Sequence, residues 1–253
     1  MLIGNYQCIS KIGEGKNSIV YSAFSNKTSE SLVLKISNNE NALENERLIL
    51  SDLHHEGIIK LIEYFEEGSK KILVLESGRD LVEYINENGT FSENEAKYRF
   101  KIIFEAIQYL HERKIIHRDI KLENVIITEK RNLKLIDFDL CYNQKRKNLP
   151  NGCGTLPYLA PEIINCRSYD NKIDVWSLGI TLYASVLGYF PFDSSDLYSY
   201  SYDALTKKPY FDFTKNLSND FIDLIGRMLE KNPLKRISIK ECLMHPWFSS
   251  LSL

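Results

Sequence analysis

The stretch from His117 to Leu140 reads HRDIKLENVIITEKRNLKLIDFDL, and it decides the fold. Two short aliphatic runs within it, Val125–Ile127 and Leu133–Ile136, are bounded by dense polar clusters. Aliphatic runs of this length predict short strands. Because polar residues at the ends of such elements are where a rigid scaffold holds reactive groups, the stretch predicts two strands with a functional site at their ends.

The polar clusters supply acids, a cation and an amide. Asp119, Lys121 and Asn124 fall within six positions, and Asp137 follows Asp119 by 18 residues. Carboxylate and amide oxygens are hard ligands, which suit magnesium and phosphate rather than zinc.

Composition and charge narrow the class of protein. The 253 residues are 43% apolar and 26% charged, which is ordinary for one large globular domain or two lobes. The net charge of −2 gives no global attraction to nucleic acid. The five cysteines are odd in number and form no CxxC pair, which argues against disulfides and zinc. Without a signal-peptide pattern or a membrane-length apolar run, we expect an intracellular protein, cytoplasmic or nuclear, with no nucleic-acid or membrane partner. The sequence leaves its oligomeric state open.

The chain changes character near residue 80. Before it, short runs rich in β-branched and aromatic residues predict strands at Tyr6–Ile12, Ile19–Phe24, Leu32–Ile36 and Ile72–Leu75, interrupted by one helix at Asn41–Leu53. After it, helices are predicted from a capping serine at Ser92, over the apolar run Val175–Tyr183, and from Ser218. We therefore expect an α+β fold with a small β-rich lobe (about 1–76), a join (about 76–80) and a larger helical lobe (about 81–253).

The stretch 117–139 resembles the catalytic loop H-R-D-x-K-x-x-N and the D-F-G motif of eukaryotic protein kinases. A lone Gly-x-Gly is usually an ordinary turn, and a lone lysine usually lies on the surface. Here, however, several motifs follow in order over nearly the whole chain, and they are identified as those of a kinase catalytic domain of residues 1–253. Further matches are the glycine-rich loop (Ile12–Val20), the V-A-I-K strand (Leu32–Lys35), A-P-E (Ala160–Glu162), the buried helix (Asp174–Gly179), Arg236 as the expected partner of the A-P-E glutamate, and His245–Phe248. The segment Cys153–Glu162 looks closest to checkpoint-type kinases of the calmodulin-dependent-kinase-like group.

The resemblance implies roles for five catalytic residues. Lys35 is expected to contact the α and β phosphates of ATP, and Glu46 to orient it, with Glu44 as the solvated neighbour. Asp119 is expected to accept or orient the proton of the substrate hydroxyl. Lys121 is expected beside the γ phosphate, and a lysine there resembles serine/threonine kinases. Thr155 is expected to hydrogen-bond within the catalytic loop.

The resemblance also implies ATP and Mg²⁺ as cofactors, with Mn²⁺ possible. Asn124 and Asp137 are expected to hold the metal. Leu75 is expected at the back of the adenine pocket. The hinge at Glu76–Gly78 is shorter than the common E-Y-x-x-G-G-E-L form, so it assigns no ribose contacts. The nucleotide-binding residues are expected to be Ile12, Gly13, Gly15, Ser18 in place of a third glycine, Val20, Val33, Lys35, Leu75, Glu76, Gly78 and Ile126.

Asp139 stands where D-F-G has glycine. Aspartate tolerates the left-handed backbone region better than most residues, and it adds a charge near the metal site. The alternatives are a non-specific serine/threonine protein kinase acting on protein substrates, or a pseudokinase scaffold that binds nucleotide or partners with little turnover. We favour the enzyme, because Lys35, Glu46, Asp119, Asn124 and Asp137 are all present. Replacing Asp139 with glycine is expected to keep or raise activity.

Two further expectations concern substrate and regulation. Asp80 and Glu123 match acidic positions that face upstream arginines in basophilic relatives, whereas Ala184 occupies a third such position. Arg118 resembles an arginine that usually pairs with a phosphate on the following loop. Because residues 140–154 contain no Ser, Thr, Asp or Glu, activity is not expected to depend on Ser/Thr phosphorylation there. Arg118 is then solvated or bonded to backbone carbonyls.

Overall fold

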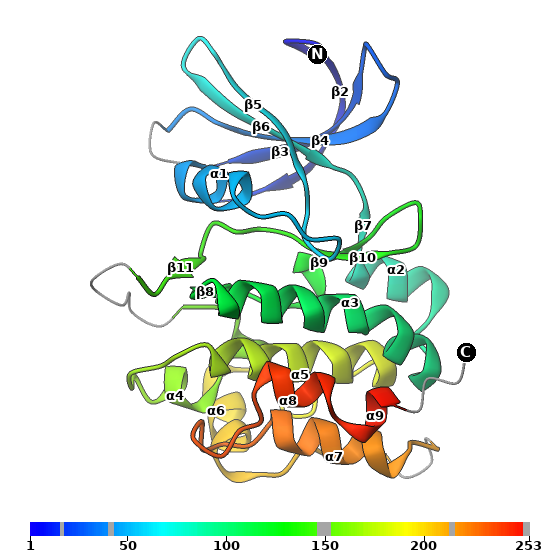
Figure 1. The fold of residues 1–253 in the computed structure, drawn as a ribbon, viewed down its shortest axis with the longest axis vertical. Coiled ribbons are helices and arrows are strands. Elements are labelled where there is room, and N and C mark those ends of the chain that lie inside the picture. The colour runs from blue at the N-terminus through cyan, green and yellow to red at the C-terminus, as the bar shows by residue number, and fades with distance from the viewer. Residues whose placement is uncertain (16–17, 40–42, 146–152, 213–215, 250–253) are drawn as a thin grey trace.

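The computed structural model describes residues 1–15, 18–39, 43–145, 153–212 and 216–249. An antiparallel sheet with one helix beside it lies above a larger helical lobe (Figure 1). This is the two-lobe α+β fold that the sequence predicts. Within the described ranges, no helix combines the length and the apolar character that crossing a bilayer requires.

The upper lobe is a six-stranded sheet in the order β1-β2-β3-β4-β6-β5. Its β6 strand is apolar on both faces because each face meets a different core. Ile72 and Val74 pack with residues of β1 to β4, whereas Leu73 and Leu75 join the main core. The strands are β1 Leu2–Ile3, β2 Tyr6–Glu14, β3 Ile19–Ser25, β4 Ser31–Ser37, β5 Leu61–Glu67 and β6 Lys70–Glu76.

Helix α1 spans Glu44–Ser51 and is shorter than the predicted Asn41–Leu53. Leu43 adopts a left-handed backbone with φ of 67°, so the helix begins only at the next residue. Residues 41 and 42 of the predicted helix lie outside the described residues. The predicted apolar face is confirmed, since Leu43, Leu50 and Leu53 are all buried.

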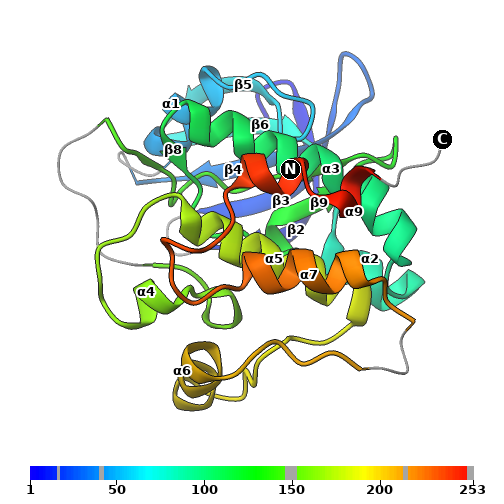
Figure 2. The same cartoon turned by 60° about the horizontal axis from the view of Figure 1, so that its bottom comes forward.

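The lower lobe is built around α5. This helix is buried on nearly every face between α3 and α7 (Figure 1), as its apolar sequence predicts. Figure 2 shows α6 at the outer edge of the lobe. The helices are α2 Leu81–Asn88, α3 Glu93–Glu112, α4 Pro161–Ile164, α5 Lys172–Leu187, α6 Leu197–Thr206, α7 Asn219–Met228, α8 Ile239–Leu243 and α9 Pro246–Ser249.

The stretch that begins at His117 forms the predicted strand pair between the lobes. Strands β9 (Val125–Ile127) and β10 (Leu133–Leu135) are antiparallel, and β7 (Arg79–Asp80) extends them to three. A second small pair joins β8 (Ile115–Ile116) to β11 (Tyr142–Asn143). The polar segments 117–124 and 137–139 therefore emerge at neighbouring ends of short strands, next to the upper sheet.

Candidate active site

The catalytic-loop backbone is anchored by a buried carboxylate on α5. Asp174 accepts hydrogen bonds from the backbone amides of His117 and Arg118, both at 2.9 Å, and lies 2.8 Å from His111 Nε2. Burial alone would raise the pKa of Asp174, but the bonds from His111 and the Arg118 amide hold that pKa below its ordinary value. These bonds also support Arg118 at φ of 74°, a strained value for a non-glycine residue.

Three predicted catalytic side chains, those of Asp119, Lys121 and Thr155, form one hydrogen-bonded group. Lys121 Nζ donates to Asp119 Oδ2 at 2.6 Å, and Thr155 Oγ1 donates to Asp119 Oδ1 at 3.0 Å. Lys121 Nζ also lies 2.9 Å from Thr155 Oγ1. Thr155 is 36 residues further along the chain, so its bond ties a second segment to the catalytic loop. A carboxylate with both oxygens bonded is held in one orientation, which is what positioning of a reacting hydroxyl requires.

Asn124 is oriented by the same aspartate. Its Nδ2 donates to the backbone oxygen of Asp119 at 2.8 Å and to Oδ2 at 3.0 Å. Because the amide nitrogen is committed in this way, the amide oxygen is the atom left for a cation. Asn124 and Asp137 both line the same cleft, and their oxygens suit a hard divalent cation.

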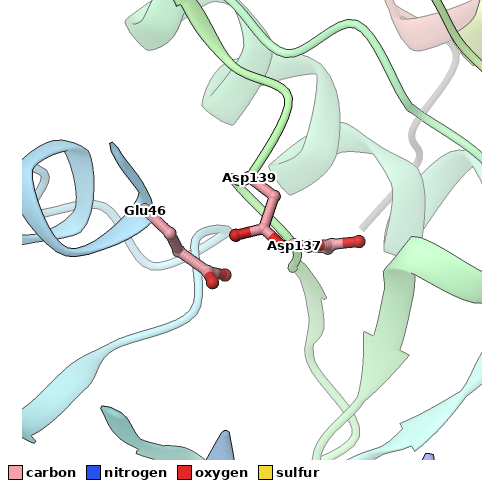
Figure 3. Close-up of side chains that lie close together, drawn as sticks. All are labelled: Glu46, Asp137 and Asp139. Atoms are coloured by element: carbon pink, nitrogen blue, oxygen red, sulfur yellow. The ribbon is translucent and has the colours of Figure 1, made fainter. Parts of the chain in front are cut away.

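Lys35 lies at the centre of an ionic cluster. Its Nζ donates to Glu46 at 2.7 Å, to Asp137 at 3.0 Å and to Asp139 at 3.0 Å. Figure 3 shows Glu46 reaching from α1 toward the two aspartates of the segment after β10. Glu46 Oε1 also accepts from the Phe138 amide at 3.2 Å, which ties α1 to that segment.

Burial and charge oppose each other in this cluster. Burial would lower the pKa of Lys35, but its three carboxylate partners raise that pKa above its ordinary value. Burial would raise the pKa of Asp137, but Lys35 holds it below the usual range. Burial and the two aspartates raise the pKa of Glu46, against the pull of Lys35. Lys35 is therefore the cation that keeps the group together.

The unusual backbone of the IDFD segment falls on its first aspartate. Asp137 has φ of 63°, whereas Asp139 is not among the residues with positive φ. The need for a glycine-like conformation at position 139, which the motif suggests, is therefore not present here. Phe138 is fully buried and meets the His117 ring edge-on with centroids 4.9 Å apart. What distinguishes Asp139 is its charge and its contact with Lys35.

A cleft of about 500 Å³ between the lobes joins these groups. Every nucleotide-binding residue that the sequence predicts lines it, together with predicted catalytic and metal-binding side chains. A wider hollow of about 820 Å³ lies outside the hinge, around Ser77, Arg79 and Glu83, but none of the catalytic residues lines it. The cleft lining includes Ile12, Gly13, Gly15, Ser18, Val20, Val33, Lys35, Leu75, Glu76, Gly78 and Ile126.

The hinge approaches β9 unusually closely. A Cβ at Gly78 would lie 2.8 Å from Ile126 Cδ1 and 2.9 Å from the Ile127 carbonyl oxygen, so only glycine fits. The side chain of Glu76 turns away and pairs with Lys134 at 2.8 Å. Of Glu76, therefore, the backbone and not the carboxylate faces the cleft.

A second buried ion pair fixes the segment that carries Thr155. Arg236 donates to both oxygens of Glu162 at 2.7 and 2.9 Å, as the sequence predicts. Arg236 also donates to the carbonyls of Lys172 and Glu230. Arg118 donates to the backbone carbonyl of Leu140 at 3.2 Å. Of the two alternatives for Arg118 that the sequence left open, solvation or bonding to backbone carbonyls, this is the second.

Sequence reasoning missed two parts of this arrangement. Asp174 was predicted only as the start of a buried helix, although an aspartate opening an otherwise apolar helix is itself a signal for a buried polar contact. Asn45 carried no such signal. Its Nδ2 donates to the backbone oxygens of Asp139 and Cys141 at 3.0 and 3.1 Å.

Comparison with known proteins agrees with the geometry. Residues 6–248 match the model of the protein kinase domain. The chain is 35% identical to serine/threonine-protein kinase cds1 of Schizosaccharomyces pombe, over 98% of this chain and 59% of the relative. It is 36% identical to the carbon catabolite-derepressing protein kinase of Saccharomyces cerevisiae, over 97% and 40%. It is 34% identical to the maternal embryonic leucine zipper kinase of Xenopus tropicalis, over 97% and 39%. The chain thus spans less than two thirds of the length of these relatives.

Proposed function

The chain belongs to the protein kinase domain family, and from this premise we propose that it transfers the γ-phosphoryl group of ATP to serine and threonine hydroxyls of protein substrates. The observation that carries the proposal is the bonded set of Asp119, Lys121, Asn124 and Thr155, of which Lys121 and Asn124 line the same cleft as Lys35. We further propose that residues 1–253 act as one catalytic domain, with lobes of about 1–76 and 81–253 joined at about 76–80.

Phosphoryl transfer depends mainly on alignment and on neutralised charge. Lys35, held by Glu46, is placed to bind the α and β phosphates. Asp119 is placed to accept or orient the proton of the attacking hydroxyl, and Lys121 to offset negative charge on the transferred group. Thr155, bonded to Asp119, shapes the acceptor position for a serine or threonine.

Family members use ATP with a divalent metal, and we propose Mg²⁺ here, with Mn²⁺ as a substitute. Asp137 and the Asn124 amide oxygen are the groups that would hold it. When bound, the cation neutralises phosphate charge. The proposal is tested by transfer from ATP to a generic serine peptide with Mg²⁺, with Mn²⁺ and with a chelator. Transfer in either metal and none in chelator is expected, whereas equal transfer in chelator would refute the cation dependence.

We infer an intracellular location, cytoplasmic or nuclear, from the cysteines. All five (Cys8, Cys141, Cys153, Cys166 and Cys242) are free thiols. Free thiols are typical of reducing compartments.

Substrates with arginine N-terminal to the acceptor are expected to be favoured. Asp80 and Glu123 both line the cleft and carry negative charge toward it. Because partly exposed charge pairs contribute modestly, an upstream arginine is expected to raise kcat/KM by about threefold to tenfold on a peptide array. The variant Asp80→Asn should shrink that preference, since asparagine can still cap α2 as Asp80 does. A preference for upstream acidic residues would contradict the assignment.

Activity is expected to persist without phosphorylation of the loop after Asp139. Arg118 already has a backbone partner in Leu140 and packs its guanidinium 5.8 Å from the Tyr169 ring. Residues 146–152 of that loop lie outside the described residues. Phosphatase treatment of protein made without an upstream kinase should change the peptide-kinase rate by less than about twofold. A collapse of the rate, traced to a site between Leu140 and Gly154, would overturn this expectation.

A further inference from the structure

The ammonium of Lys35 is fully occupied by the protein itself. A lysine has three N–H donors and no acceptor. Glu46, Asp137 and Asp139 accept from it at 2.7, 3.0 and 3.0 Å. Any phosphate that binds Lys35 must therefore displace at least one carboxylate.

The three carboxylates differ in how readily they can leave. The side chain of Glu46 is only 1% exposed, whereas those of Asp137 and Asp139 are 37% and 42% exposed. Glu46 is further held by the Phe138 amide. The two aspartates are therefore the groups that yield to an incoming phosphate.

Asp139 stays close to the site even when its side chain moves. Its backbone oxygen is held by Asn45 of α1, and the same amide group holds the Cys141 oxygen. The carboxylate can rotate away from Lys35, but its charge remains near the phosphates. A glycine at this position would bring neither the competing oxygen nor the charge.

Resting on the proposed ATP-dependent function, we propose that Asp139 competes with nucleotide phosphates for Lys35 and so makes nucleotide binding depend more steeply on a divalent cation. Lys35 and Glu46 neutralise each other, so Asp137 and Asp139 leave two negative charges facing the phosphates. These carboxylates and the phosphates are both negative, and in a partly buried site, where water reduces their interaction less, they repel strongly. The carboxylate oxygens of Asp137 and Asp139 lie within 4.8 Å of one another, so positive charge brought to Asp137 offsets both. Asp139 thus disfavours cation-free nucleotide in particular.

The test is calorimetric binding of ADP, in excess chelator and in saturating Mg²⁺, to wild type, Asp139→Gly and Asp139→Asn. In chelator, both variants are expected to bind ADP at least about tenfold more tightly than wild type. In Mg²⁺ the difference should fall below about threefold, because the cation offsets the repulsion. The asparagine variant removes only the charge, whereas the glycine variant removes the charge and also gives the backbone more freedom. Comparing the two therefore separates these effects.

Glu44→Gln is the matched control. Glu44 lies on α1 and pairs with Arg47 at 2.8 Å, away from Lys35, so its loss of charge should leave both affinities at the wild-type level. Equal ADP affinity of all proteins in chelator would overturn the proposal. So would tighter binding by the glycine variant alone, or weaker binding by both variants in both conditions. If no protein, wild type included, binds ADP even in Mg²⁺, the proposed ATP-dependent function itself is wrong.

Discussion

Replacing Asp119 with asparagine is expected to lower peptide phosphorylation by about 10²–10⁴-fold, the range typical for removing a general base. Asp119 is the carboxylate around which Lys121, Asn124 and Thr155 are arranged. Asparagine has nearly the same shape but cannot take up a proton. Initial rates at saturating ATP measure the effect.

Nucleotide binding separates this loss from general damage. The Asp119 carboxylate is bonded to Lys121, Asn124 and Thr155, whereas the Lys35 ammonium is bonded to a separate set of three carboxylates. The variant should therefore bind Mg²⁺–ADP within about threefold of wild type, since a residue that acts mainly in the transition state contributes little to ground-state binding. A rate within tenfold of wild type, with the fold intact, would remove Asp119 from the proposed role.

The buried pair of Arg236 and Glu162 predicts a large effect on stability. Their side chains are 0% and 3% exposed, and the pair is bidentate. Arg236→Met leaves the Glu162 carboxylate buried without its partner, which costs about 3–5 kcal/mol. For a domain of this size, the melting temperature should fall by roughly 10 °C. Differential scanning calorimetry measures the shift.

An exposed ion pair between an arginine and an aspartate provides the control. Arg227 pairs with Asp223 at 3.0 Å, and both side chains are at least half exposed. Arg227→Met should move the melting temperature by less than about 2 °C. Adding Glu162→Leu to Arg236→Met should restore part of the lost stability, because the unpaired charge is then gone. An unchanged melting temperature in Arg236→Met would show that the pair does not anchor this segment.

Local pattern predicted most of the fold. The central strands and the buried α5 were predicted because their residues are apolar at the right spacing. Strand β5 was missed, since Leu61–Glu67 lies at the sheet edge and carries exposed charged residues. The start of α1 was wrong because its limit is the backbone of Leu43, which no side-chain pattern indicates.

In the candidate site, too, some features could be predicted from local sequence and others depend on packing between distant segments. Residues that phosphoryl transfer needs in a fixed order, such as Asp119 and Asn124, could be predicted from their motif. The contact of Asp139 with Lys35 joins positions 104 residues apart. It depends on how α1 and the segment after β10 pack, with Asn45 between them. The sequence predicted that the Asp139 carboxylate lies near the metal site, but not that it pairs with Lys35.

Whether this chain transfers phosphate is decided by one assay, in which purified wild-type protein, ATP and Mg²⁺ are incubated with a serine peptide that carries an upstream arginine. ADP formation and peptide phosphorylation are measured together, the latter by mass spectrometry. We expect equal amounts of ADP and phosphopeptide from wild type, with phosphate on the serine hydroxyl, and at least about 10²-fold less phosphopeptide from Asp119→Asn. Tight binding of Mg²⁺–ADP with no phosphopeptide, in Mg²⁺ or in Mn²⁺, would contradict this expectation and identify the chain as a nucleotide-binding scaffold.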